Sequence, residues 1–170
     1  LSIRRQRQMC IRDRNGISSQ GNPLFEANPG GAPCNVLAML TKLGHKTAFI
    51  GKVGNDFFGK QLEQTIIDVG IDASGLQKDD DVHTTLALVH TYPDGDRDFS
   101  FYRNPGADMM LKEEEVPEEL IKGTRIFHFG TLSMTHEGVR NQQKKHFVLQ
   151  KKLVLSFPLI RICASRSGTP

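Results

Sequence analysis

The chain has 170 residues, a formal net charge of +3 at pH 7 and 38% hydrophobic residues, which suits one ordinary folded domain. The excess basic residues lie at the two ends, because residues 15 to 140 hold 11 Lys and Arg against 18 Asp and Glu. An acidic central region argues against nucleic-acid binding by the folded part. No apolar run approaches the roughly 20 residues that a membrane helix needs, so we expect no membrane partner.

The first 14 residues, LSIRRQRQMCIRDR, contain five Arg and one Asp. They could form a basic arm or an Arg-rich transit peptide, but such a peptide should also be rich in Ser and cleanly amphipathic. The string RQMCIRDR is similar to translated sequencing-adaptor DNA. We therefore interpret residues 1–14 as a non-native leader and expect no strand in it.

A glycine pair precedes the first predicted helix. Gly30 and Gly31 lack Cβ atoms, so the backbone can turn sharply there and a polar ligand can approach the main chain. Pro33 suits a first helical turn. Asn35 lies near the positive end of the helix dipole, where its side chain could bind the hydroxyl groups of a small polar ligand. The alternative for Gly31 and Asn35 is a plain helix-entry turn with a cap.

Two helices and a strand are predicted next. Residues 33 to 43 form the first helix, ended by Gly44, with an apolar stripe that comprises Val36, Leu37, Met39, Leu40 and Leu43. A strand is predicted over residues 47 to 53. The second helix covers residues 56 to 69 and ends at Gly70, with one apolar face made of Phe58, Leu62, Ile66 and Val69. Asp56 suits its N-cap better than a catalytic role.

A hairpin follows, with strands over residues 84 to 90 and 97 to 102 joined by the turn sequence Tyr-Pro-Asp-Gly-Asp. A short acidic helix is predicted over residues 113 to 121 and a buried strand over residues 125 to 130. Helices that alternate with strands in this way indicate an α/β fold with a layered, mostly parallel sheet.

Several of these segments resemble the signatures of the ribokinase/PfkB family of sugar kinases, and the fructokinases most closely. The resemblance rests on Gly30, Gly31, Pro33, Asn35, Gly44 and Gly54 at the family's spacings, on GNDFFG at 54–59, on Thr84-Thr85, on DFSFYRNPGAD at 98–108 and on FHFGTLSM at 127–134. Leu37 departs from the family pattern, which prefers a small residue there. The resemblance covers residues 15–140 and corresponds to the N-terminal part of a sugar-kinase domain.

The resemblance implies an incomplete ribokinase-like three-layer α/β/α sandwich with a small β-lid hairpin. The lid of such kinases closes over the sugar and often pairs between subunits, which implies a possible homodimer. Substrate-binding roles are implied for Gly30, Gly31, Asn35, Phe101 and Arg103, with fructose as the expected sugar. Phe101 could instead be a core residue. Arg103 could instead form a surface salt bridge with Asp98 or Asp108, and it would also suit the carboxylate of a sugar acid.

In the family, ATP and Mg²⁺ serve the reaction, and a later Gly-Ala-Gly-Asp segment supplies the general base and an anion-binding helix N-terminus. This sequence contains no Gly-x-Gly-Asp. We therefore assign no catalytic, cofactor or metal residue, and expect the fragment to bind ATP poorly and to be inactive. The alternatives are a noncatalytic sugar-binding or regulatory dimerisation module, and a nucleoside kinase of the same superfamily, which the lid string FYRNPGAD disfavours.

From Asn141 onward acidic residues and the family resemblance both stop. A shifted reading frame with free codon choice can restore a family-like Asp-Pro-Asn-x-Arg strand, so we interpret residues 141–170 as a frameshifted tail, the alternative being a divergent basic tail. Sequencing the source DNA across this stretch distinguishes the two. Only Cys34 of the three cysteines belongs to the matched region, which suits a reducing cytoplasm.

Overall fold

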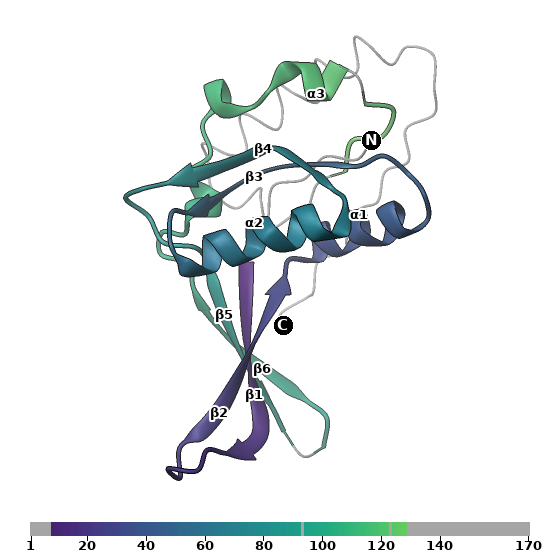
Figure 1. The fold of residues 1–170 in the computed structure, drawn as a ribbon. Helices are drawn as coiled ribbons and strands as arrows, with labels where there is room; N and C mark the ends of the chain where they lie inside the picture. Colours follow the sequence, from purple (N-terminus) through teal and green to yellow (C-terminus); the bar gives the residue numbers. More distant parts are fainter. Residues whose placement is uncertain (1–7, 93, 123, 129–170) are drawn as a thin grey trace, which may run out of the picture.

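The computed structural model describes residues 8–92, 94–122 and 124–128 (Figure 1). The strands are β1 (Gln8–Ile17), β2 (Pro23–Gly30), β3 (Ala48–Gly54), β4 (Asp72–Asp79), β5 (Leu86–Thr91) and β6 (Arg97–Tyr102). The helices are α1 (Ala32–Lys42), α2 (Phe57–Val69) and α3 (Glu118–Lys122), with the short 3-10 turns η1 (Ala107–Met109) and η2 (Glu113–Glu115). None of the described helices is long and apolar enough to cross a membrane.

Strand β3 lies between two helical layers and is buried at every position (Figure 1). It pairs in parallel with β4, and its alternate side chains enter two separate cores. The core toward α1 and α2 contains Leu37, Phe49, Val53, Leu62 and Ile66. The core toward α3 contains Ile50, Leu111, Val116 and Ile121. The predicted layered α/β arrangement is therefore confirmed for the part formed by β3, β4 and the helices, which we call the body.

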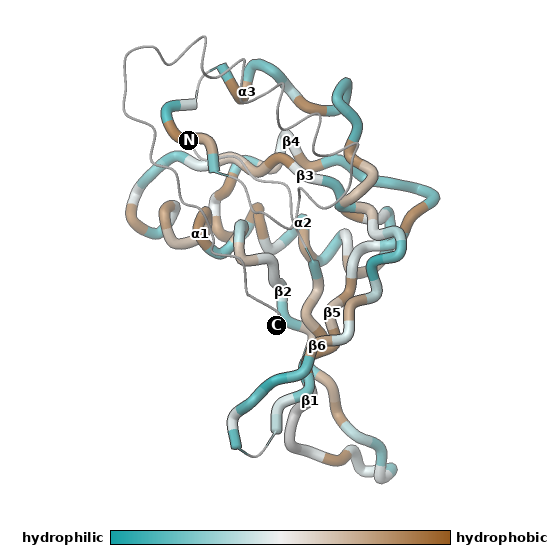
Figure 2. Tube along the Cα trace, turned by 180° about the vertical axis from the view of Figure 1, so that it is seen from behind, coloured by the Kyte–Doolittle hydropathy of each residue, from teal (hydrophilic) through white to brown (hydrophobic). Residues whose placement is uncertain are grey.

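The second sheet forms a lid whose strand order is β2-β1-β5-β6. Strand β1 is antiparallel to β2 and parallel to β5, and β5 is antiparallel to β6, which confirms the predicted hairpin. Figure 1 shows the far halves of these strands extending away from the helices, and Figure 2 shows a hydrophilic turn between β5 and β6.

The expectation that residues 1–14 contain no strand was wrong, because β1 begins at Gln8. Met9 is fully buried and Ile11 packs against the same core as α1 and α2. Because residues 1–14 are rich in Arg, the short alternation of apolar residues at Met9 and Ile11 was not interpreted as a strand. Hydrogen bonds to strands on both sides then make these residues central to the lid sheet.

The predicted apolar face of α1 was partly wrong, whereas that of α2 was correct. The buried residues of α1 are Pro33, Cys34 and Leu37, while Val36, Met39 and the C-cap residue Leu43 are exposed. The apolar stripe is wider than the surface that the helix buries, so periodicity alone did not select the contact face. Helix α2 buries Leu62 and Ile66 and partly buries Phe58 and Val69, as predicted.

The predicted ends of both helices are confirmed. Gly44 has φ +83° and its N–H donates to the Thr41 carbonyl, while the His45 N–H donates to the Leu40 carbonyl, which is a Schellman ending. Gly70 ends α2 with φ +88°. Both positions require positive φ and hence favour glycine.

Sequence reading did not predict β2 and β4, and it joined two helical segments that are separate. The predicted helix at 113–121 is divided into η2 and α3 before Pro117, which cannot continue a helix from the preceding residues. Of the predicted strand at 125–130, residues 125–128 are irregular and the rest lies outside the described residues, as does the tail from 141 to 170.

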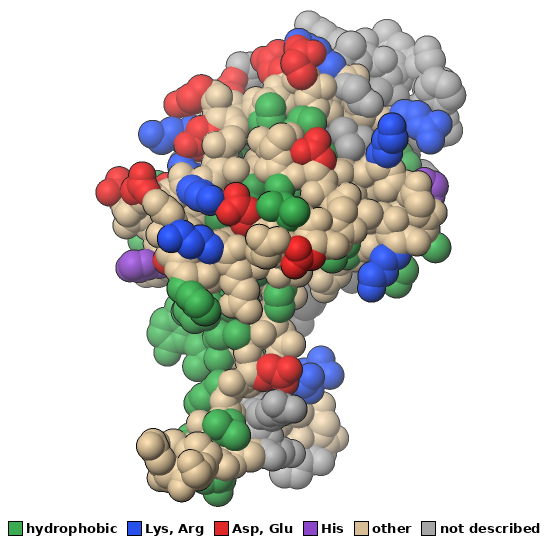
Figure 3. Space-filling model, in the orientation of Figure 1, with side chains coloured by type: hydrophobic (Ala, Val, Ile, Leu, Met, Phe, Trp, Pro, Cys, Tyr) green, Lys and Arg blue, Asp and Glu red, His purple; other side chains and the backbone are tan. Residues whose placement is uncertain are grey.

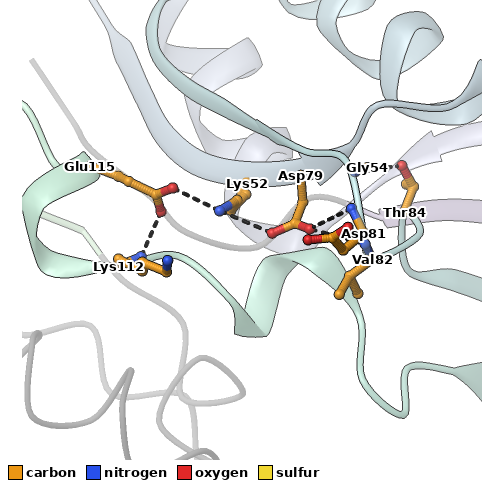
Figure 4. A network of polar contacts seen from close by, with 8 residues as sticks. All are labelled: Lys52, Gly54, Asp79, Asp81, Val82, Thr84, Lys112 and Glu115. Atoms are coloured by element: carbon orange, nitrogen blue, oxygen red, sulfur yellow. Dashed lines mark hydrogen bonds and ion pairs between the residues drawn. The ribbon is translucent and has the colours of Figure 1, made fainter.

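A buried charge network lies on the α3 side of β3 (Figure 4). The Lys52 ammonium, on a residue only 4% exposed, lies 3.0 Å from Asp79 Oδ2 and 2.7 Å from Glu115 Oε1. Burial is the largest influence on the Lys52 pKa and acts to lower it, but the two carboxylates together outweigh burial and raise the pKa. Lys52 therefore stays charged at neutral pH, and the network links β3, β4 and η2.

Asp56 joins the body to the lid. Its carboxylate accepts from the Gly59 N–H at 2.7 Å, which caps α2, and from the N–H and hydroxyl of Thr84, both at 2.8 Å. The Thr84 hydroxyl also accepts from the Gly54 N–H at 3.0 Å. Burial would raise the Asp56 pKa, but these hydrogen bonds and the nearby His83 outweigh it and lower the pKa below its ordinary value.

The first prediction concerns the close approach at this junction. A Cβ on Gly59 would lie 1.9 Å from the Gly54 carbonyl oxygen and 3.0 Å from Thr84 Oγ1. Gly59→Ala should therefore destabilise the chain by about 1–3 kcal/mol or more, measured by urea unfolding. Gly16→Ala is the matched control, because a Cβ there meets only Leu24 at an ordinary 3.5 Å. Equal urea midpoints for the two variants would contradict the proposed close packing.

The second prediction concerns pH. The pKa values of Asp56 and Asp79 are lowered in the folded state, so their stabilising contribution is present above the ordinary value of 3.8 and is lost as pH falls through the folded values. Asp56→Asn should lower stability at pH 7 by about 1–3 kcal/mol and flatten the acid limb of the stability curve. Asp68→Asn, at an exposed carboxylate of α2, is the control. An unchanged acid limb in Asp56→Asn would refute this role.

Candidate functional site

Gly30 and Gly31 form the junction between β2 and α1, and both are buried. A Cβ on Gly30 would lie 2.3 Å from Cys10 Sγ, so no larger residue fits without movement of the neighbouring strand. Gly31 is the N-cap of α1 and has φ +104°, a conformation that favours glycine. Its carbonyl accepts from the N–H groups of Cys34 and Asn35 at 2.9 and 3.2 Å.

Asn35 lies in the first turn of α1, and its side chain is exposed. The turn contains no acidic residue and receives no hydrogen bond from a capping side chain. The positive end of the helix dipole is therefore not offset by a carboxylate at α1, in contrast to α2, where Asp56 supplies one. An amide side chain here can both donate to and accept from a polyhydroxylated ligand.

Phe101 lies on β6 and is 54% exposed, so it is not a core residue of the described part of the chain. Its ring stacks on Phe99, with ring centroids 6.1 Å apart and an interplanar angle of 10°. Figure 3 shows hydrophobic side chains gathered along the lid below the body. The two stacked rings offer an apolar surface of the kind that contacts the face of a sugar.

Arg103 follows β6 and forms a salt bridge with Asp108, one of the two partners considered from the sequence. Its Nε lies 3.0 Å from Asp108 Oδ2, and its Nη2 contacts the same oxygen at 2.5 Å. The pair is not at the surface, because Asp108 is only 4% exposed. Asp108 also accepts from the Thr85 hydroxyl. Arg103 is therefore held against the base of the lid.

Strand register brings the predicted residues to one end of the lid sheet. Gln8 of β1 is opposite Gly30 of β2, and Leu86 of β5 is opposite Tyr102 of β6, one residue before Arg103. Met9 of β1 pairs with both Pro29 and Leu86, so Pro29, Met9, Leu86 and Tyr102 form one row across the four strands. Gly30 and Arg103 each lie one residue beyond this row, Gly30 at one end and Arg103 at the other. Three spacings of about 4.8 Å place the two ends of the row about 14 Å apart.

Gly30 and Phe101 also belong to the same face of this sheet. Phe101 is opposite Ala87, and Ala87 pairs with Cys10 of β1, so the three residues share a face. Gly30 lies on this face too, because a Cβ built on it would point toward Cys10 Sγ. Sequence reading missed Cys10 because it expected no strand before residue 15. It placed Ala87 in a predicted strand without assigning it to the site, and it named Asp108 only as an alternative ion-pair partner.

The sequence matches the pfkB family carbohydrate kinase profile over residues 10–145. A probable fructokinase-5 of Arabidopsis thaliana is 45% identical over 130 residues, which are 76% of this chain and 40% of that protein. A fructokinase of Solanum tuberosum is 41% identical over 137 residues, 81% of this chain and 43% of that protein. The chain thus spans about two fifths of the curated relatives it matches.

Solved structures share the fold. The fructokinase of Xylella fastidiosa superposes with a TM-score of 0.84 and 25% identity over 90% of this chain and 47% of its own. A structure of that fructokinase with bound ATP gives a TM-score of 0.83. These neighbours show that the α/β fold described above is ribokinase-like. From the family match over most of its length, this chain belongs to the pfkB family of carbohydrate kinases.

Proposed function

We propose that this chain is the sugar-binding part of an ATP-dependent fructokinase-type enzyme, which transfers the γ-phosphoryl group of ATP to a sugar hydroxyl. The observation that supports this best is the row across the base of the lid, with Gly30 and Gly31 at one end and Arg103 at the other. Fructose is the proposed sugar, because the curated relatives at 40–45% identity are named fructokinases.

Each residue has a distinct task in this proposal. The amide of Asn35 and the backbone at Gly31 hydrogen-bond sugar hydroxyls, and the exposed ring of Phe101 packs against the apolar face of the sugar. Arg103, which Asp108 holds in place, donates to a sugar oxygen. The lid also excludes water, which would otherwise compete for the phosphoryl group.

ATP and Mg²⁺, which the family implies, do not fit the described residues. The N-terminus of α2 already holds the Asp56 carboxylate, whose charge would repel a phosphate. No group of His, Cys, Asp and Glu suited to a metal ion occurs in the described part of the chain. We therefore place the nucleotide site and general base in the part of the relatives that this chain does not span, and propose that the chain alone transfers no phosphoryl group.

A second candidate is a noncatalytic sugar-binding or regulatory module that dimerises through the lid. It is favoured by exposed hydrophobic residues on the lid strands, namely Ile17, Leu24, Phe25, Phe99, Phe101 and Tyr102. Strands β2 and β6 are also edge strands of the lid sheet and can pair with another copy. For both candidate functions we propose that the protein is located in the cytoplasm.

The third prediction tests sugar binding by calorimetry with the 170-residue chain. Fructose should bind more tightly than ribose or adenosine. Asn35→Ala should weaken fructose binding about three- to tenfold, the effect of one lost hydrogen bond. Asn22→Ala, an exposed Asn in the turn between β1 and β2, should leave the affinity unchanged.

Three results would overturn the proposal: no fructose binding by a folded chain, no difference between the two Asn variants, or a preference for adenosine, which would indicate a nucleoside kinase. Sugar phosphate formation by this chain with ATP would refute the proposed inactivity. Sedimentation then tests the second candidate, which requires a dimer that Phe99→Ser weakens, and a monomeric chain would rule that candidate out.

A further inference from the structure

We propose that Asp108 is a specificity-determining residue, which neutralises and orients Arg103 so that the site selects neutral sugars over sugar acids. The inference rests on the proposed sugar-binding function. From the sequence alone, the Arg103 guanidinium suits the hydroxyls of a ketose and the carboxylate of a sugar acid equally well. The surroundings of Arg103 distinguish these two ligands.

The contact between Arg103 and Asp108 is a charge-assisted fork. Arg103 Nε lies 3.2 Å from Asp108 Oδ1 and 3.0 Å from Oδ2, and Nη2 contacts Oδ2. Asp108 is 4% exposed and Arg103 is half-buried. Charges paired this closely and with this little water have almost no net field for an incoming carboxylate.

Asp108 cannot easily move away from this position. Its Oδ1 accepts from the Thr85 hydroxyl, and the carbonyl of Thr85 accepts from the Met9 N–H at 3.0 Å. The Ala107 N–H donates to the His83 carbonyl at 3.0 Å, which ties η1 to the same loop. The carboxylate is thus anchored to the root of β5 before any ligand arrives.

Gly106 shows how closely the group is packed. A Cβ there would lie 2.0 Å from Thr85 Oγ1, 2.9 Å from Asp108 Oδ1 and 3.0 Å from Arg103 Cγ. Side chains packed this closely leave the guanidinium few alternative rotamers. Arg103 therefore offers a sugar hydroxyl a fixed direction of donation at little further entropy cost.

The fourth prediction compares the dissociation constants of D-fructose and D-gluconate, a sugar acid of similar size. The wild-type chain should prefer fructose. Asp108→Asn keeps the shape of the side chain but removes the negative charge beside Arg103, so the affinity ratio should shift toward gluconate by about tenfold. Adding Arg103→Met should reverse this shift, because Arg103 carries the charge in question.

If Asp108 had a purely structural role, Asp108→Asn would weaken the binding of both ligands equally and leave the ratio of their dissociation constants unchanged. That result overturns the inference. A wild-type preference for gluconate also overturns it. Failure of the proposed function is distinguishable, because the wild-type chain would then bind no fructose at all.

If Asp108→Asn does not fold, the wild-type chain still decides the question. With a neutralised Arg103, gluconate binding should not change between about 20 and about 200 mM salt, whereas an unpaired charge would weaken it several-fold over this range.

Discussion

The two adjacent threonines before β5 hold the described structure together. Thr84 is bound by the Asp56 carboxylate at the start of α2, and Thr85 is bound by the Asp108 carboxylate of η1. This short segment therefore forms hydrogen bonds with the start of α2 on one side and with η1, at the base of the lid, on the other. Because hydrogen bonds to carboxylates are strong and directional, the orientation of the lid strands depends on these two contacts.

Glycine makes both contacts possible. Gly54 and Gly59 allow β3, α2 and Thr84 to approach one another, and Gly106 allows Thr85, Asp108 and Arg103 to do so. At the other end of the row, Gly30 allows β2 to lie against Cys10. These positions share one physical requirement, the close approach of backbone to a polar side chain or a neighbouring strand, which explains why the family-like glycines coincide with the candidate site.

Local sequence signals predicted the elements that depend on local forces. The α2 cap at Asp56, the ending at Gly44 and the hairpin of β5 and β6 follow from capping and turn chemistry. Strand β4 could not be predicted in this way, since its polar sequence becomes a strand only by pairing with β3, and Gly75 is needed where Phe49 O approaches. The same holds for β1, where Arg12 and Arg14 follow the buried Met9 and the partly buried Ile11. The site residues came from the family resemblance, whereas the burial of the Arg103 pair required the fold.

The central claim is that Gly30, Gly31, Asn35, Phe101 and Arg103 form one sugar site at the base of the lid. The most direct test is a ¹⁵N-labelled NMR titration of the 170-residue chain with fructose. Shifts confined to these residues and their strand neighbours Cys10 and Ala87 are the predicted result. Shifts that instead cluster at Met39 and Lys42 near the end of α1 or at the far turns of the lid, or no shifts at saturating sugar, would contradict a site in this place.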